Sequence, residues 1–593
     1  MTDKSSQQVL EVLDSFARLP REDGDNKIMC ADEAIRRFIQ PGMSIHIGIT
    51  NSIPYGLSYE LIRQFSASKP GFDIITLGAI NHIIVMMHLG MVKKVVTTYA
   101  GDPYPSPTPN IVVQNLYLNK QVDIENWSIL AFTLRLMAGA LGTGFMPVNS
   151  IMDSTMETEN RDSFRRLPAP FAQQGEIGAL KALNPDISLY HAFVADRSGH
   201  AIFTPPYAEE FYGAYASRNG VIISAEHIVD EDVIRKYSHL SKIPSYLVRA
   251  VVPMEFGSHP SGMAESGFAE FDGYSEDYDF ILGFREAAKS IPTLDQWIHD
   301  WVTGVPDHDG YIRKLGGQRL VYLKGKAKPL SWADEIKDVV GSVSSSAQPS
   351  KNELMTAMAA VLLEEKIREK SYRTVLAGIG NSNIAAWLSA LRLKQEMIDV
   401  ELVAEVGFYG YYPRPGNPFI FNFANIPTCK MLTSAFDALG LMVGGFSNQA
   451  IGIIGAGQID RFGNINSTRV GDGIFLVGSG GGNDVTAGAR ETIVVCPLNP
   501  MRFVDTVSYI TGPGRKVSTL VTDMGVFEKD SRGEFVLTRY PQKPGLDLDA
   551  HVRAVKEKTG WDVGSAAVLK PIPYPSVETL ITMRLFDPRK AFL

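Results

Sequence analysis

A glutamate at the end of a short apolar alternation is the residue of this chain best placed for chemistry. The segment 399–410, DVELVAEVGFYG, alternates apolar side chains up to Ala404 and then breaks at glycines and aromatics. This pattern predicts a short strand followed by a loop. Glu405 therefore stands where the strand ends, and in α/β sheets clefts form at the carboxyl ends of strands. A carboxylate facing such a cleft can act as a nucleophile; the alternative is a solvated loop glutamate.

A glycine-rich loop, Gly478-Ser-Gly-Gly-Gly-Asn-Asp484, follows a second predicted strand. Glycines let a ligand approach backbone N–H groups, because no Cβ stands in the way. The loop lacks the Gly-Lys-Ser/Thr of a P-loop, and Asn483 stands where a dinucleotide fingerprint needs its third glycine. We expect Gly478, Gly480 and Gly481 to present backbone donors to an oxyanion or thioester carbonyl, with a tight turn between packed elements as the alternative.

A third segment, 455–467, reads GAGQIDRFGNINS. Its Asp460, Gly463 and Asn464 are typical of a tight turn between strands. Gln458 is different, because an amide at a strand end can point a donor into the same cleft as the glycine-rich loop.

The sequence lacks the residue patterns of other catalytic classes. His46, His82 and His191 lie in apolar segments, so we expect core histidines, and neither a Ser-His-Asp order nor metal-ligand spacing is legible. A carboxylate nucleophile remains, which can form a covalent acyl intermediate beside a backbone oxyanion loop. Acyl exchange between a thioester and a carboxylate needs no metal and no redox cofactor, and we predict no permanently bound cofactor.

Length and composition place these motifs in a cytoplasmic protein of several domains. The chain has 593 residues, too many for one core, and a net charge of −8 without a basic block, which argues against a nucleic-acid partner. Its three cysteines are far apart, which fits a reducing compartment. No uncharged apolar run reaches the roughly 18 residues of a membrane span, and the polar N-terminus has no apolar signal core.

The elements that would position the motifs occur twice. Two divergent copies of one α/β domain, each with an open, mostly parallel sheet, are the simplest interpretation. The repeated pairs of segments are 44–65 with 372–393, 186–196 with 451–460, and 220–224 with 491–496. We predict domains at 1–335 and 353–593, joined by a serine-rich linker at 336–352.

Several motifs resemble those of family I coenzyme A transferases, in particular the glutaconate CoA-transferase type. The resemblance rests on the duplicated halves, the segment 455–467, the loop 478–484 and Val521-Thr-Asp-Met-Gly-Val526. It covers nearly the whole chain and implies two homologous domains of the NagB/RpiA-like type. The first domain would be A-subunit-like and the second B-subunit-like, fused in one chain, and the family further implies a homo-oligomer.

This resemblance implies a reaction and a set of residues. The protein would move CoA between an acyl-CoA and a carboxylic acid, a dicarboxylic acid included, by ping-pong chemistry. Glu405 matches the glutamate that forms a glutamyl-CoA thioester, and Gly480 and Gly481 match the loop over that thioester. In the A-like half, a turn matches the substrate-facing turn by position; its residues are Thr50, Asn51 and Ser52.

Other activities of the same fold stay open at this point. Some relatives are acyl-CoA hydrolases, including ring-opening hydrolases of steroid catabolism, which use an acid of the A half; here the A-half loop offers only Asp102. A decarboxylase branch has cysteine in the glutamate's place, which Glu405 speaks against. A non-catalytic acyl-CoA-binding protein is a further alternative. The turn 378–383 and the proline-rich loop 101–110 depart from the family pattern, so the substrate is not carried over from glutaconate.

Overall fold

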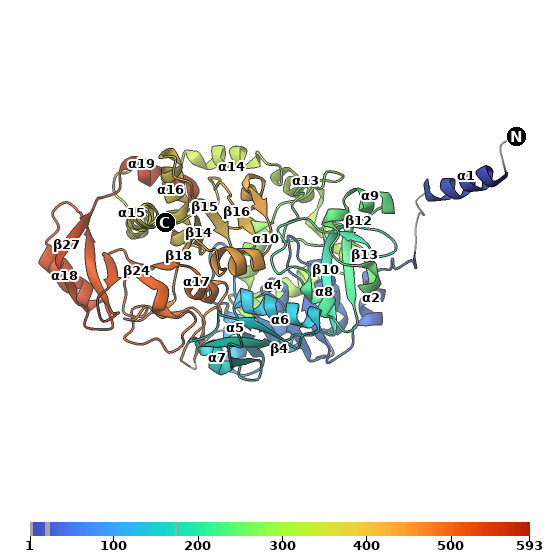
Figure 1. Cartoon of the computed structure of the whole chain (residues 1–593), viewed down its shortest axis with the longest axis horizontal. Helices are drawn as coiled ribbons and strands as arrows, with labels where there is room; N and C mark the ends of the chain where they lie inside the picture. The colour runs from blue at the N-terminus through green and yellow to red at the C-terminus, as the bar shows by residue number, and fades with distance from the viewer. Residues whose placement is uncertain (1–3, 18–23, 172–174, 472) are drawn as a thin grey trace.

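The computed structural model describes residues 4–17, 24–171, 175–471 and 473–593 and has two lobes. In Figure 1 the first lobe, blue to green, lies at the right, and the second, yellow to red, at the left. Each lobe is built on one large β-sheet with helices packed against it. Among the described residues, no helix is long and apolar enough to cross a membrane.

The sheet of the first lobe has eight strands. They are β1 (Ser44–Ile47), β2 (Phe72–Ile75), β4 (Val92–Thr97), β6 (Asp123–Asn126), β10 (Ile187–Ala195), β11 (Ala201–Ile202), β12 (Val221–Ile228) and β13 (Val248–Pro253). Their order is β13-β12-β10-β1-β2-β4-β6, all parallel, and β11 pairs antiparallel with β10. All nine residues of β10 are buried, as expected of a parallel strand covered on both faces.

The sheet of the second lobe has ten strands. They are β14 (Thr374–Ala377), β15 (Glu401–Ala404), β16 (Phe408–Tyr409), β17 (Met431–Leu432), β18 (Ala450–Ile454), β23 (Glu491–Val495), β24 (Val517–Val521), β25 (Val526–Lys529), β26 (Phe535–Pro541) and β27 (Ser565–Ile572). Their order is β17-β16-β15-β14-β18-β23-β24-β25-β26-β27. The five central strands, β15 to β24, are parallel.

The two sheets share one strand order. Five strands of the first, β13-β12-β10-β1-β2, correspond to β24-β23-β18-β14-β15 of the second. In each lobe the strand that opens the repeat, β1 or β14, leads through a turn into a helix, α3 (Tyr55–Phe65) or α16 (Asn381–Gln395). The predicted duplication and the α/β class with two open, mostly parallel sheets are thereby confirmed.

Helices and small sheets complete the lobes. The remaining helices of the first lobe are α2 (Ala31–Phe38), α4 (Asn81–His88), α5 (Ile111–Leu118), α6 (Ile129–Leu141), α7 (Thr155–Glu159), α8 (Tyr212–Ala216), α9 (Glu231–Lys236), α10 (Tyr278–Ala287), α11 (Ile291–Ile298), α12 (His308–Leu315) and α13 (Gly317–Lys326). Those of the second lobe are α15 (Lys351–Lys370), α17 (Gly482–Gly488), α18 (Leu548–Glu557) and α19 (Val577–Phe586). The small sheets pair β3 (Gly78–Ala79) with β5 (Tyr99–Ala100), β9 (Glu176–Lys181) with both β7 (Phe145–Val148) and β8 (Phe164–Pro168), β19 (Gln458–Ile459) with β20 (Ile465–Asn466), and β21 (Arg469–Val470) with β22 (Ile474–Phe475). The amphipathic helix α1 (Lys4–Ala17) lies apart from the body in Figure 1.

The edge strand of the first sheet is polar and leads directly into a helix. Strand β6 ends at Asn126, and α6 begins at Ile129 after Ser128 as N-cap. Because β6 is a short polar strand at the edge of its sheet, its sequence carries no apolar alternation to indicate a strand.

The connection between the lobes is held by an arginine. Helix α14 (Ser331–Val340) runs into the predicted linker, and 341–350 have no helix or strand before α15. Arg584 donates to the backbone carbonyls of Ser344, Ser346 and Gln348 and pairs with Glu353. The serine-rich segment is therefore bound to the second lobe along its length.

Candidate active site at the junction of the lobes

Glu405 directly follows β15, at the carboxyl end of that strand. The turn after it is closed by the N–H of Gly407, which donates to Ala404 O at 3.0 Å. Gly407 has φ +110°, and a Cβ there would lie 2.3 Å from Thr433 O, so only glycine fits. Glu405 is partly buried and stands where the apolar alternation predicted it.

The glycine-rich loop pairs with the first lobe in the manner of an added strand. Ala100 N donates to Val477 O at 2.8 Å, and Gly480 N donates to Thr98 O at 2.9 Å. Gly478 has φ +108°, and a Cβ there would lie 2.5 Å from Thr98 O. Glycine at 478 is therefore required for the approach of the two backbones, and the loop belongs to the junction between the lobes.

One glycine of this loop faces the carboxylate. The N–H of Gly481 hydrogen bonds Glu405, and a Cβ on Gly481 would lie 2.2 Å from Glu405 Oε2. The N–H groups of the other two glycines are used elsewhere, since Gly478 donates to Ser467 O and Gly480 to Thr98 O. This corrects the prediction that Gly478 and Gly480 also provide donors to an oxyanion.

Asp484, at the end of the same motif, joins the loop to the first lobe. Its carboxylate accepts from Ser128 Oγ at 2.7 Å and from Leu130 N at 3.0 Å, so a second-lobe residue caps α6 of the first lobe. The N–H of Ile129 donates to Gly480 O at 3.1 Å. Asp484 is 2% exposed, and the N-terminus of α6, with its positive dipole end, lies against the loop.

The pKa values of Glu405 and Asp484 are both raised. Burial and repulsion by Asp484 raise the pKa of Glu405 to about 7, while the N–H of Gly481 acts in the opposite direction. Burial raises the pKa of Asp484 to about 6, and the hydrogen bonds from Leu130, Ser128 and Ser150 act in the opposite direction. A carboxylate with weak solvation and a pKa near neutrality is a better nucleophile than a solvated one, and such shifts cluster at functional sites.

Comparison with known proteins agrees with this geometry. A family model described as coenzyme A transferase matches residues 28–253. The A subunit of glutaconate CoA-transferase from Acidaminococcus fermentans is 25% identical over 317 residues, 50% of this chain and 95% of that protein. The B subunit of 3-oxoadipate CoA-transferase from Pseudomonas knackmussii is 28% identical over 262 residues, 41% of this chain and 95% of that protein. The chain belongs to the coenzyme A transferase family.

This coenzyme A transferase also shares its fold with a solved structure over nearly its whole length. An acyl-CoA transferase from Escherichia coli O157:H7 superposes with a TM-score of 0.64 at 15% identity, covering 96% of this chain and 98% of that one. Because the chain aligns to both halves of two-subunit relatives, it is consistent with a fusion of the two.

The predicted substrate-facing turn of the transferase is hydrogen bonded within its own lobe. Asn51 donates to Thr204 Oγ1 at 2.8 Å and Ala264 O at 2.9 Å. Ser52 Oγ donates to His191 O at 2.6 Å, and Thr50 Oγ1 donates to Ser52 O at 3.3 Å. These contacts hold the turn at the end of β1. A direct contact with substrate stays a prediction.

The remaining predicted polar residues also have partners. Gln458 Nε2 donates to Met501 O at 3.0 Å, and its Oε1 accepts from Asn466 at 3.0 Å, so the amide is engaged in its own hairpin rather than free as a donor. Asp102 accepts from Asn110 at 2.9 Å, and burial raises its pKa.

The predicted core histidines are confirmed as buried side chains. His191 is bound between Ser224 and Glu226 Oε1, the latter at 2.7 Å. His46 is 3.0 Å from Glu209. His82 is fully buried, and burial lowers its pKa to about 3, so it is a neutral core residue.

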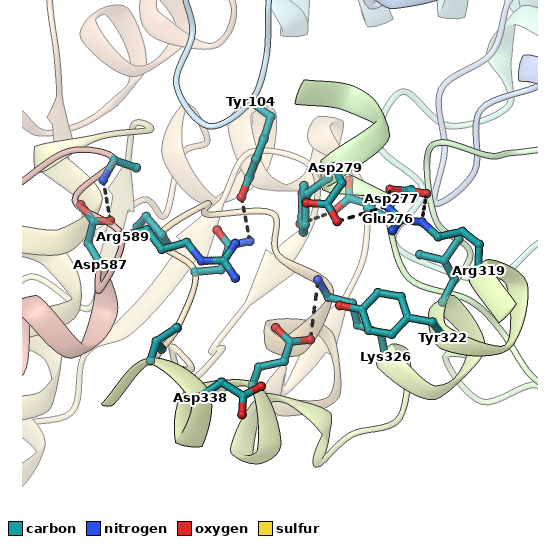
Figure 2. Close-up of a pocket in the computed structure, with 18 residues that line it drawn as sticks. Tyr104, Glu276, Asp277, Asp279, Arg319, Tyr322, Lys326, Asp338, Asp587 and Arg589 are labelled. Atoms are coloured by element: carbon teal, nitrogen blue, oxygen red, sulfur yellow. Dashed lines mark hydrogen bonds and ion pairs between the residues drawn. The ribbon is translucent and has the colours of Figure 1, made fainter. Parts of the chain in front are cut away.

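A separate cavity of about 150 Å³ lies between the lobes, and residues of α14 form part of its lining. In Figure 2, Tyr104 of the first lobe, Asp338 of α14 and Arg589 of the second lobe converge on it. None of the predicted site residues lines it. Its six acidic side chains outnumber three basic ones, which disfavours the phosphates of CoA; the acids are Glu276, Asp277, Asp279, Glu335, Asp338 and Asp587, and the bases Arg319, Lys326 and Arg589.

Proposed function

We propose that this coenzyme A transferase moves CoA between an acyl-CoA thioester and a carboxylic acid through a covalent thioester on Glu405. The observation that carries the proposal is the contact between the Glu405 carboxylate and the N–H of Gly481 at the junction of the lobes. A carboxylate nucleophile beside a backbone donor is the pair that acyl exchange requires.

The chemistry would run in two symmetrical halves. A Glu405 oxygen attacks the thioester carbonyl carbon, the C–S bond breaks, and the CoA thiolate leaves a mixed anhydride of the acyl group and Glu405. The thiolate then attacks the Glu405 carbonyl carbon, and the first acid departs as its carboxylate. The second acid's carboxylate attacks the resulting glutamyl thioester and the same steps run in reverse, so no proton, metal or electron acceptor is consumed.

The environment of Glu405 suits each of these steps. Partial burial and the nearby Asp484 leave the carboxylate weakly solvated, with a pKa of about 7, so it is substantially ionised at neutral pH and a stronger nucleophile than in water. When Glu405 becomes a thioester, its former carboxylate oxygen becomes a carbonyl oxygen, and the N–H of Gly481 is in place to stabilise the tetrahedral oxyanion.

The acid substrates belong to the same proposal. Both relatives compared above are named for dicarboxylic acids, glutaconate and 3-oxoadipate, so we include dicarboxylic acids among the acceptors. The second lobe would act as the B-like half, which carries the nucleophile, and the first as the A-like half. The proposal needs no permanently bound cofactor, and it places two fused halves in each protomer of a homo-oligomer.

The test is covalent trapping on the full chain. The protein is incubated with a panel of acyl-CoAs, reduced with borohydride, and analysed by intact mass and peptide mass spectrometry. We expect reduction of Glu405 to the alcohol, and its loss in Glu405→Gln together with all exchange activity. Exchange at the wild-type rate by Glu405→Gln would overturn the proposal. Free CoA released without a modified peptide would instead favour a hydrolase and turn attention to Asp102.

A further inference from the structure

Asp484 connects the nucleophile's loop to the opposite lobe. It lies three residues after Gly481, in the first turn of α17. Its two carboxylate oxygens accept from Oγ of Ser128, the N-cap of α6, and from N of Leu130 in the first turn of that helix. Asp484 is 2% exposed, so these bonds are made away from solvent, where hydrogen bonds to a charged group are stronger than those between neutral groups.

The short path from Asp484 to Glu405 makes this cap relevant to the reaction. Gly480 is bonded to the first lobe on both its sides, through its N–H to Thr98 O and through its carbonyl to Ile129 N. Gly481 follows directly and donates to Glu405. The loop is therefore fixed before Gly481 by backbone pairing and after it by Asp484.

We propose that Asp484 is a positioning residue for Glu405: by capping α6 of the first lobe, it fixes the N–H of Gly481 on the nucleophile and sets the charge that the nucleophile feels. The inference rests on the proposed role of Glu405 and deepens it. In this arrangement the first lobe contributes to the nucleophile's reactivity through its contacts with the loop 478–484.

A purely structural cap and a positioning carboxylate differ in their effect on ionisation. Asp484 is the charged group that acts on Glu405. Around Asp484 itself the described partners are neutral donors, namely Ser128, Leu130 and Ser150. Replacing Asp484 by asparagine removes the negative charge and keeps one acceptor oxygen. The pKa of Glu405 should then fall, because a repelling charge has been removed.

The experiment compares Asp484→Asn with Ser128→Ala. Ser128→Ala removes one hydrogen bond to the carboxylate and keeps the charge. We measure the pH profile of exchange with whichever acyl-CoA wild type uses, and, independently of turnover, the pH dependence of carbodiimide labelling of Glu405, followed by peptide mass spectrometry. Carbodiimide reacts with the protonated carboxyl, so labelling reports ionisation even if no exchange is detected.

Distinct outcomes are expected for the two variants. Asp484→Asn should lower exchange by roughly 10- to 100-fold and move both the acid limb of the profile and the labelling midpoint to lower pH. Ser128→Ala should lower exchange less and leave the midpoint near that of wild type. A folded Asp484→Asn with wild-type exchange and an unmoved midpoint would overturn the proposal.

Two further results separate this inference from the proposed function. If Asp484→Asn does not fold, the test uses Ser128→Ala, in which the rate of formation of the Glu405 thioester is compared with that of wild type. A slower rate would support the positioning role of Asp484, and an equal rate would overturn it. If wild type forms no thioester at all, the proposed function fails, while a moved labelling midpoint in Asp484→Asn would still establish that Asp484 sets the ionisation of Glu405.

Discussion

Adding one methyl group at Gly481 tests the site most directly. Gly481 has an ordinary negative φ of −82°, so alanine is accommodated by the backbone itself. Its Cβ, however, would lie 2.2 Å from Glu405 Oε2. The methyl group therefore collides with the proposed nucleophile rather than with the core.

The size of the effect follows from that distance. A carbon–oxygen contact needs about 3.4 Å, so the carboxylate or the loop must move by roughly 1 Å, and a misplacement of 1 Å costs about 100-fold in rate. This corresponds to about 2.7 kcal/mol of transition-state stabilisation. The hydrogen bond from Gly481 to Glu405 is lost in the same movement.

Its neighbour Gly480 provides a matched control. Gly480 has φ +50° and no atom within 4 Å of an added Cβ, so Gly480→Ala strains the backbone by about 1 kcal/mol without touching Glu405. We expect both variants to fold, as judged by thermal unfolding. The initial rate of CoA exchange should fall about 100-fold in Gly481→Ala and only a few-fold in Gly480→Ala. Equal losses in the two, or full activity in Gly481→Ala, would refute the reasoning.

Two stability predictions follow from buried carboxylates. Because the folded pKa of Glu405, about 7, lies above its ordinary value of 4.5, its contribution to stability is present below about pH 4.5 and is lost as pH rises through 7. The free energy of unfolding of Glu405→Gln, measured in urea, should therefore exceed that of wild type by up to about 3 kcal/mol at pH 8 and by little at pH 4.5. A difference that does not change with pH would contradict this. Arg584→Met leaves Glu353 buried without its partner at 2.6 Å, so the second lobe should lose about 3–5 kcal/mol, with partial recovery in a double variant that also carries Glu353→Gln.

The repeat was legible in the sequence because its central strands are buried on both faces. Segments such as β10 and β18 are continuous apolar runs, and the residues that follow them break the pattern at glycine and polar turns. Glu405 was found by the same signal, since a strand that ends in a carboxylate is visible as an interrupted alternation. The edge strand β6 has no such period, so the sequence alone does not indicate a strand there.

The partners of the glycine-rich loop could not be predicted in this way. Gly480 bonds to Thr98, more than 380 residues earlier in the chain, and no local pattern reports a contact between lobes. The sequence indicated that backbone N–H groups would be accessible in this loop, but which of them remain available depends on the docked lobe. No role for Asp484 could be predicted for the same reason, since its partners lie in the other lobe. The two ends of this contact, an acid in the first turn of a helix and a serine N-cap at 128, are each indicated by local sequence.

These long-range bonds tie the surroundings of the proposed nucleophile to both halves of the chain. Glu405 and Gly481 come from one lobe, yet the loop that carries Gly481 is paired with residues 98–100 and capped onto α6 of the other. If the lobes separated, each could keep its own sheet, because the strand order is complete within each lobe. The N–H of Gly481 would then lose both of its flanking anchors, and the carboxylate would regain water and its ordinary pKa. The reactive state proposed for Glu405 would thus be a property of the docked pair, and fusion of the halves raises the effective concentration at which they dock.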